Sequence, residues 1–140
     1  AYRANAAAFG TELTALDAEF TAGLRTCESR DLVTSHAAFG YLTERYDFTQ
    51  RSIAGLSPDA EPDAASMTSI VAAVRAQGVR TIYSETLVDP ALAETIARET
   101  GASVAVLDPI EGVTDRSAGR TYLEIMRSNL RTLVAGQRCS

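Results

Sequence analysis

The chain of 140 residues contains no lysine and no tryptophan, a single histidine and only two cysteines. So few nitrogen and sulfur ligands exclude a zinc finger, an iron–sulfur cluster, and a metal site built from several histidines of this chain alone. Long hydrophobic runs are also missing. Val104 to Leu107 is a typical run, far short of the roughly 20 apolar residues that cross a bilayer. The sequence therefore predicts no membrane-spanning helix.

Positive charge is limited and dispersed. All thirteen basic residues are arginines, scattered from Arg3 to Arg138, against 18 acidic residues, so the net charge is −5. Nucleic-acid binding needs a clustered basic surface that neutralises phosphates, so we expect no nucleic-acid partner. Neither of the glycine-rich phosphate-binding motifs, GxGxxG and the P-loop, occurs. What remains is the composition of an ordinary globular protein, at a length that favours one domain.

Hydrophobic periodicity predicts strands that alternate with helices. Helices are expected over residues 2–24, 37–46, 63–77, 89–101 and 120–135, and strands over residues 31–35, 48–54, 80–84 and 103–107. The strands are interpreted as continuous apolar runs, which is typical of a parallel sheet covered on both faces. The predicted fold is α/β: a four-stranded parallel sheet flanked by helices on both faces, preceded by a long helix. Five residues give that helix one apolar stripe: Phe9, Leu13, Leu16, Phe20 and Leu24.

Polar side chains follow the predicted strands. His36 comes after the first strand, Glu85 after the third and Asp108 after the fourth. The loop after the second strand contributes Ser57, Asp59 and Glu61. Ligands of open parallel sheets bind beyond the carboxyl ends of the strands, so we expect these side chains to share one edge. An imidazole together with carboxylates suits a divalent transition metal.

Purely structural roles remain open for the same residues. A histidine after a strand often only bonds to backbone, an Asp before Pro often starts a turn, and Glu85 has many arginines to pair with. Ser35 and His36 are adjacent, so by themselves they do not form a nucleophile–base pair. A signalling or enzymatic domain on the same architecture is the competing hypothesis, because a fold does not determine a function.

The two cysteines, Cys27 and Cys139, lie near the two ends of the predicted domain. A bridge between them closes a loop of about 110 residues, worth roughly 4–5 kcal/mol in the chain-entropy account. Two unrelated thiols are the alternative. We expect the disulfide, and a disulfide indicates an extracytoplasmic location.

Six motifs, in order, resemble one known family. They are Val33-Thr-Ser-His-Ala-Ala-Phe-Gly-Tyr-Leu, Gly55-Leu-Ser-Pro-Asp-Ala-Glu-Pro, Ile82-Tyr-Ser-Glu, Leu92-Ala-Glu-Thr-Ile-Ala-Arg-Glu-Thr-Gly, Val106-Leu-Asp-Pro-Ile-Glu-Gly and Tyr122-Leu-Glu-Ile-Met-Arg-Ser-Asn-Leu. The series resembles the C-terminal lobe of the zinc- and manganese-binding solute-binding proteins of metal ABC transporters. The resemblance covers essentially the whole chain.

The resemblance implies two α/β lobes joined by a long rigid helix, with the metal between the lobes. Residues 1–26 then correspond to the end of the linking helix and residues 27–140 to the C-terminal metal-binding lobe, without the N-terminal lobe and its two histidine ligands. It further implies that His36 and Asp108 are metal ligands. Glu85 matches a glutamate near the cleft, to which we assign a supporting role in orienting a ligand.

The implied function is capture and delivery of a metal, not catalysis. Zinc is the expected metal and manganese the alternative, and the expected partners are an ABC permease and the N-terminal lobe. With only part of the ligand set, the chain alone is expected to bind metal weakly or not at all. The implied location is periplasmic or on the cell surface, with a lipid anchor upstream of this sequence. A surface adhesin of the same family is a further alternative.

Overall fold

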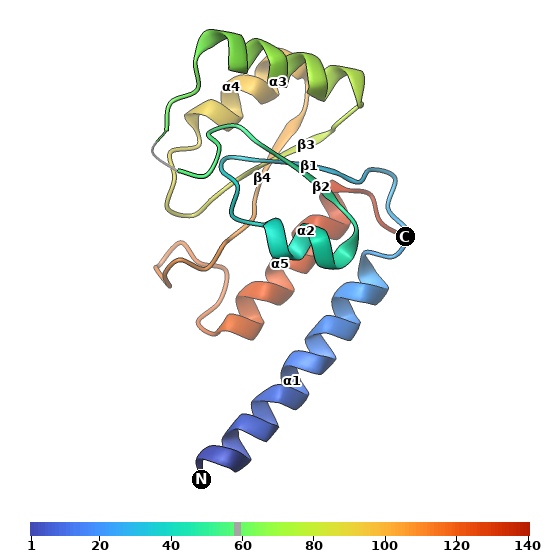
Figure 1. The fold of residues 1–140 in the computed structure, drawn as a ribbon, viewed down its shortest axis with the longest axis vertical. Helices are drawn as coiled ribbons and strands as arrows, with labels where there is room; N and C mark the ends of the chain where they lie inside the picture. The colour runs from blue at the N-terminus through green and yellow to red at the C-terminus, as the bar shows by residue number, and fades with distance from the viewer. Residues whose placement is uncertain (58–59) are drawn as a thin grey trace.

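The computed structural model describes residues 1–57 and 60–140. The elements follow in the order α1 (Tyr2–Gly23), β1 (Asp31–Thr34), α2 (Gly40–Tyr46), β2 (Thr49–Ser52), α3 (Ala64–Ala76), β3 (Thr81–Ser84), α4 (Ala91–Thr100), β4 (Ser103–Val106) and α5 (Tyr122–Gly136). The four strands form one parallel sheet in the order β2-β1-β3-β4 (Figure 1). The predicted α/β fold is confirmed.

The sheet separates two hydrophobic cores. Helices α3 and α4 lie on one side and α1, α2 and α5 on the other (Figure 1). Neighbouring strand residues point to opposite faces, so Leu32 and Tyr83 enter the core under α1 and α5, whereas Val33 and Ile82 enter the core under α3 and α4. All four side chains are fully buried. Helices on both faces therefore enclose the central strands.

The two edge strands differ from the expected apolar runs. Strand β2 is polar, Thr49 to Ser52, and its side chains are alternately exposed and half-buried. Strand β4 is apolar, but Val104 and Val106 are exposed. The expectation of continuous buried runs was therefore wrong for these two strands. An edge strand has a neighbour on one side only and is incompletely covered by the helices, so its sequence is less constrained than that of β1 or β3.

Capping residues explain several helix boundaries. The Asp63 carboxylate caps α3 by accepting the Ser66 N–H at 2.7 Å, and Gly101 ends α4 at a φ of +77°. Helix α4, expected from residue 89, begins at Ala91: Pro90 is the N-cap residue, and the Asp89 carboxylate accepts the Ala91 N–H. Helix α2 begins at Gly40, three residues later than expected, and the Ala37 N–H instead donates to the Gly55 carbonyl at 2.6 Å.

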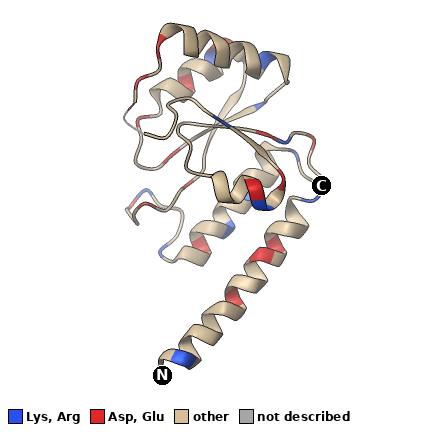
Figure 2. Cartoon of the chain, in the orientation of Figure 1, with Lys and Arg blue, Asp and Glu red and all other residues tan. Residues whose placement is uncertain are grey.

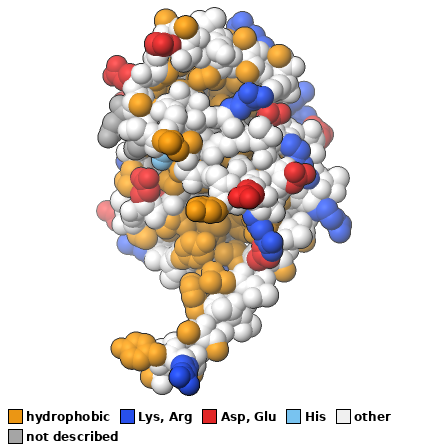
Figure 3. All heavy atoms as spheres, viewed as in Figure 1, with side chains coloured by type: hydrophobic (Ala, Val, Ile, Leu, Met, Phe, Trp, Pro, Cys, Tyr) orange, Lys and Arg blue, Asp and Glu red, His pale blue; other side chains and the backbone are white. Residues whose placement is uncertain are grey.

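Helix α1 is buried only along its second half. Leu16, Phe20 and Leu24 pack into the core, whereas Phe9 is 46% and Leu13 36% exposed, so the predicted apolar stripe is only partly covered. The first turns extend beyond the body of the molecule (Figure 1), and Figure 3 shows apolar side chains along this protruding part and on the adjoining body.

Salt bridges hold α1 against the body. Asp17 accepts hydrogen bonds from the Arg45 guanidinium at 2.7 Å and from the Tyr46 hydroxyl at 2.8 Å, and Glu19 pairs with Arg127 of α5. The bond from Arg45 is the main reason why the pKa of Asp17 is lowered, while burial raises the pKa of Tyr46 to about 12. Elsewhere in the view of Figure 2, basic positions are scattered singly over the elements.

A disulfide closes the domain. It joins Cys27, four residues past the end of α1, to Cys139, across a sequence separation of 112 residues. The Ser140 N–H donates to the Thr26 carbonyl beside it, at 2.8 Å. The predicted bridge is thus present. Within the two described ranges, every helix is too short or too polar to cross a membrane.

We predict that the double substitution Cys27→Ser/Cys139→Ser lowers the free energy of unfolding by about 2–5 kcal/mol, because the bridge closes nearly the whole chain and restricts the unfolded state. Urea denaturation followed by circular dichroism measures this change. Reduced wild-type protein serves as the matched control and should unfold at the same urea concentration as the double variant. Equal midpoints for oxidised wild type and the variant would contradict a stabilising bridge.

Candidate metal centre

Three side chains singled out from the sequence lie at the carboxyl edge of the sheet. His36 lies two residues past β1, Glu85 directly past β3, and Asp108 two residues past β4. All three are buried, with at most 5% of each residue exposed. Parallel pairing aligns the ends of β1 and β3, through Val33 opposite Ile82 and Thr34 opposite Tyr83. The strands that carry His36 and Glu85 are therefore neighbours.

His36 and Glu85 form a direct hydrogen bond. The Nδ1 atom of His36 lies 2.7 Å from Oε1 of Glu85, and the same oxygen accepts the backbone N–H of His36 at 3.1 Å. A carboxylate at Nδ1 requires the proton on that nitrogen, which leaves the Nε2 lone pair free as a ligand. The His36 carbonyl accepts the Thr34 hydroxyl at 2.7 Å, so both the ring and the backbone are held.

The Glu85 carboxyl is buried. Burial is the main cause that raises its pKa, and the two hydrogen bonds from His36 act in the opposite direction. Its second oxygen, Oε2, is buried without a hydrogen-bond partner. Leaving a buried polar atom unpaired costs about 1–3 kcal/mol. Glu85 therefore contributes more to orienting the imidazole than to stability.

Glu111 approaches His36 from the opposite side, and it was missed in the sequence analysis. Its Oε1 lies 3.6 Å from Nε2 of His36, and its side chain is 47% exposed. The signal was present in the Val106–Gly112 motif, where an acidic residue follows Asp108 by three positions. The intervening Ile110 has a φ of +61°, a strained backbone conformation for a β-branched residue that costs about 1–3 kcal/mol. Periodicity cannot reveal such a turn.

Asp108 is held by backbone and side-chain contacts. One carboxylate oxygen, Oδ1, accepts the Ile110 N–H at 2.8 Å, whereas Oδ2 is buried without a partner. The Asn129 amide bonds to the Asp108 backbone from α5. Within residues 1–57 and 60–140, no group of three His, Cys, Asp or Glu side chains is arranged to hold a metal ion. The described part of the chain therefore presents donor atoms rather than an enclosed site.

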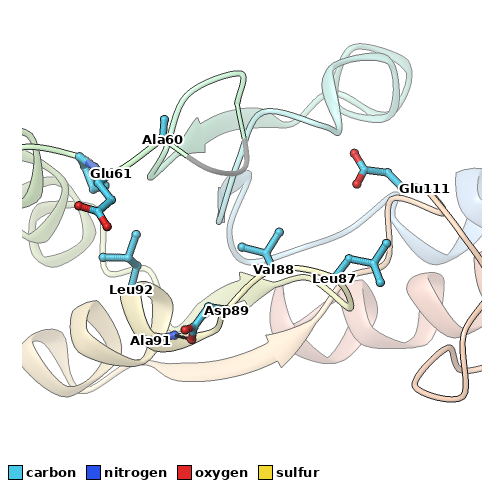
Figure 4. A pocket seen from close by; sticks show the side chains of 9 residues that line it. Ala60, Glu61, Leu87, Val88, Asp89, Ala91, Leu92 and Glu111 are labelled. Carbon is cyan, nitrogen blue, oxygen red and sulfur yellow. Dashed lines mark hydrogen bonds between the residues drawn. The ribbon is translucent and has the colours of Figure 1, made fainter.

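A cavity of about 490 Å³ opens beside Glu111. It lies between the loops that follow β2 and β3 (Figure 4), and Glu61, Asp89 and Glu111 line it together with apolar side chains, Leu87 among them. Of the loop residues named from the sequence, Glu61 thus lies at this cavity, Ser57 is exposed, and Asp59 lies outside the described residues.

The chain is similar to known proteins over almost its whole length. The chain is 41% identical over 134 residues to the zinc-binding protein AdcA of Streptococcus pyogenes, covering 94% of this chain but 26% of that protein. Two solved structures align along 97% of the chain: the laminin-binding protein Lmb of Streptococcus agalactiae (TM-score 0.90, 37% identity) and the Zn(II)-bound ZnuA-like domain of Streptococcus pneumoniae AdcA (TM-score 0.78, 38% identity).

The chain spans about a quarter of the curated relative and about half of each solved structure, since it covers 52% of both. The sequence profile of one family, described as zinc-uptake complex component A, periplasmic (ZnuA), matches residues 1–136. That match includes every helix and strand and all of the residues at the carboxyl edge of the sheet. The chain therefore belongs to the ZnuA family of zinc-uptake components.

Proposed function

We propose that this chain is the metal-binding C-terminal lobe of a solute-binding protein that captures zinc(II) and delivers it to an ABC permease. The observation that carries the proposal is the buried bond between Nδ1 of His36 and Glu85, 2.7 Å long, which leaves Nε2 as a ligand. Histidines that bind metals usually donate their other ring N–H to a carboxylate or carbonyl in this way. A histidine that only supported the fold would not need a free Nε2 beside a second carboxylate.

The lobe offers zinc a mixed set of donors. His36 contributes an imidazole nitrogen, and Asp108 contributes Oδ2, which is buried without a hydrogen bond. We add Glu111 to the ligands proposed from the sequence, because its Oε1 lies 3.6 Å from Nε2 and its flexible side chain needs only a small adjustment to share a metal with His36. Nitrogen and oxygen donors of this kind fit zinc and manganese better than calcium or magnesium.

Zinc in structural sites almost always has four ligands. The proposed site therefore needs further donors from outside this chain. We propose that residues 1–26 are the end of a linking helix and that a preceding lobe supplies the remaining ligands. The protruding half of α1, with Phe9 half exposed, is consistent with a continuation of the chain on that side. The 140-residue chain by itself then binds zinc weakly.

Two observations favour zinc over manganese as the metal that the protein carries. Several relatives carry zinc in their names, and one solved relative is described as Zn(II)-bound. Sites built from nitrogen and oxygen donors also generally bind Zn²⁺ more tightly than Mn²⁺. Manganese remains the alternative cargo, and titration with both metals under the same conditions separates the two.

The proposed location is outside the cytoplasmic membrane. The disulfide between Cys27 and Cys139 is typical of oxidising compartments, and a relative from Streptococcus pneumoniae is named a zinc-binding lipoprotein. Metal captured there has to be passed to a membrane permease. Because the buried polar residues bind and orient a metal rather than form a nucleophile–base pair, the proposed activity is transport and not catalysis.

We predict that His36→Ala weakens zinc binding by more than the roughly 10- to 100-fold loss typical of outer-shell partners, because it removes the imidazole ligand itself. Isothermal titration calorimetry with zinc sulfate measures the dissociation constant. Thr86→Ala, which removes another buried polar side chain from the same sheet edge, is the control and should bind as wild type does. Unchanged affinity in His36→Ala would refute the proposed site.

We predict that Glu85→Gln weakens zinc binding about tenfold, at the lower end of the range for such partners. Glutamine keeps a neutral acceptor for Nδ1 but removes the negative charge that makes the imidazole a better ligand. The same titration measures the effect. Glu99→Gln removes an equal charge from the exposed surface of α4 and should have no effect. Equal losses in both variants would mean that the effect is only long-range charge.

A second candidate function is adhesion, because one solved relative with a TM-score of 0.90 is described as laminin-binding. Exposed aromatic side chains such as Tyr2 and Tyr41, each 93% exposed, offer contact area to a protein partner. If this lobe adheres, immobilised laminin retains the chain saturably in surface plasmon resonance, while serum albumin does not. Equal, non-saturable responses on the two surfaces would eliminate adhesion through this lobe.

A further inference from the structure

The turn that brings Glu111 to His36 begins where the sheet ends. Strand β4 is an edge strand, paired only with β3. The last bond of that pairing runs from the Leu107 N–H to the Ser84 carbonyl, at 2.9 Å. In an extended strand, consecutive residues direct their backbone groups to opposite sides. The N–H and C=O of Asp108 therefore face away from β3, where the sheet has no further strand.

Asn129 of α5 occupies that vacant side. Its Oδ1 accepts the Asp108 N–H at 2.9 Å, and its Nδ2 donates to the Asp108 carbonyl at 2.8 Å. A side-chain amide has an oxygen that accepts and an NH₂ group that donates, both in one plane. It can therefore bond to the N–H and the C=O of one residue at once, and so takes the place of a neighbouring strand. Asn129 is only 3% exposed, and water does not compete with these bonds.

The turn itself is strained and needs such an anchor. Two residues past Asp108, Ile110 adopts a left-handed φ of +61°, and its N–H donates to Oδ1 of Asp108 at 2.8 Å. The next residue is Glu111, whose Oε1 lies 3.6 Å from Nε2 of His36. A β-branched residue leaves this conformation readily unless its surroundings hold it. The fixed point from which the turn starts is the Asp108 backbone.

We propose that Asn129 is a positioning residue for the metal site: by binding both backbone groups of Asp108, it holds the 108–111 turn so that the Glu111 carboxylate faces Nε2 of His36. The inference rests on the proposed zinc site and deepens it. Asn129 lies in α5, far in sequence from the other site residues, so no spacing motif in the sequence points to it. It binds backbone groups rather than the metal.

The test uses the 140-residue chain and its single histidine. Because His36 is the only imidazole, one set of ring signals in an NMR spectrum reports on the site without ambiguity. Two readouts are combined: the nuclear Overhauser effect between the His36 ring and the Glu111 side chain in metal-free protein, and the dissociation constant for zinc sulfate from titration of the ring signals. Both are measured well below the unfolding temperature of every variant.

Asn129→Ala is expected to lose the Overhauser effect and to bind zinc about 10- to 100-fold more weakly. Leu130→Ala is the matched control, since Leu130 is the next residue of α5 and packs against the α1 side of the core, toward Gly23. It should lower thermal stability but keep both readouts. A merely structural Asn129 would behave as Leu130 does.

A double-mutant cycle identifies the residue through which Asn129 acts. In a Glu111→Gln background, Asn129→Ala should cost clearly less zinc affinity than it does in the wild type, because one of the two carboxylates of the turn that it positions is already removed and only Asp108 is left to be displaced. Additive losses, or retention of the Overhauser effect and of zinc affinity in Asn129→Ala, would overturn the proposal. Unchanged affinity in His36→Ala would instead refute the zinc site, while the metal-free Overhauser effect would still decide whether Asn129 places the turn.

Discussion

The parallel pairing of β1 with β3 is the constraint on which the rest of this molecule depends. These two central strands are buried on both faces, and their register sets Thr34 opposite Tyr83. Two residues beyond Thr34 comes His36, and two beyond Tyr83 comes Glu85, so equal offsets from one register bring the two side chains to 2.7 Å. A shift of either strand by one residue would reverse the faces of that strand and separate the pair.

The residues at the sheet edge serve the site at the expense of stability. Glu85 and Asp108 each bury one carboxylate oxygen without a partner, and Ile110 is held at a positive φ. Buried polar groups in proteins are almost always paired, and strained residues cluster where the chain performs a function. Stability comes instead from the two hydrophobic cores, the contacts of α1 and the disulfide.

The side chains proposed as ligands lie together without enclosing a site among the described residues. The free Nε2 of His36, the unpaired oxygen of Asp108 and the half-exposed Glu111 all lie at one open edge of the sheet. Helix α1 packs with its second half on the side of the sheet that contains α2 and α5, and its first turns extend beyond the body (Figure 1). In the proposed function, a lobe of this kind would contact the metal from one side only, which would allow release of the metal.

The sequence by itself determined the order of the elements, the parallel α/β fold, the family and the pairing of the two cysteines. These follow from local signals, namely periodicity, capping residues such as Asp63, and motifs in a fixed order. It also brought His36, Glu85 and Asp108 to one edge, because strand ends in a parallel sheet align. The roles of His36 and Asp108 as metal ligands, and of Glu85 in orienting a ligand, stay predictions.

Only the tertiary structure decided which atoms meet. That Glu85 binds Nδ1 of His36 rather than an arginine depends on the strand order β2-β1-β3-β4, which no local pattern encodes. Glu111 reaches His36 through the left-handed turn at Ile110, and Asn129 reaches Asp108 across 21 positions of sequence. The exposure of β4 and of the first half of α1 was likewise unforeseen. Burial and contact are properties of packed elements, and a hydrophobic pattern shows which face can be buried but not what covers it.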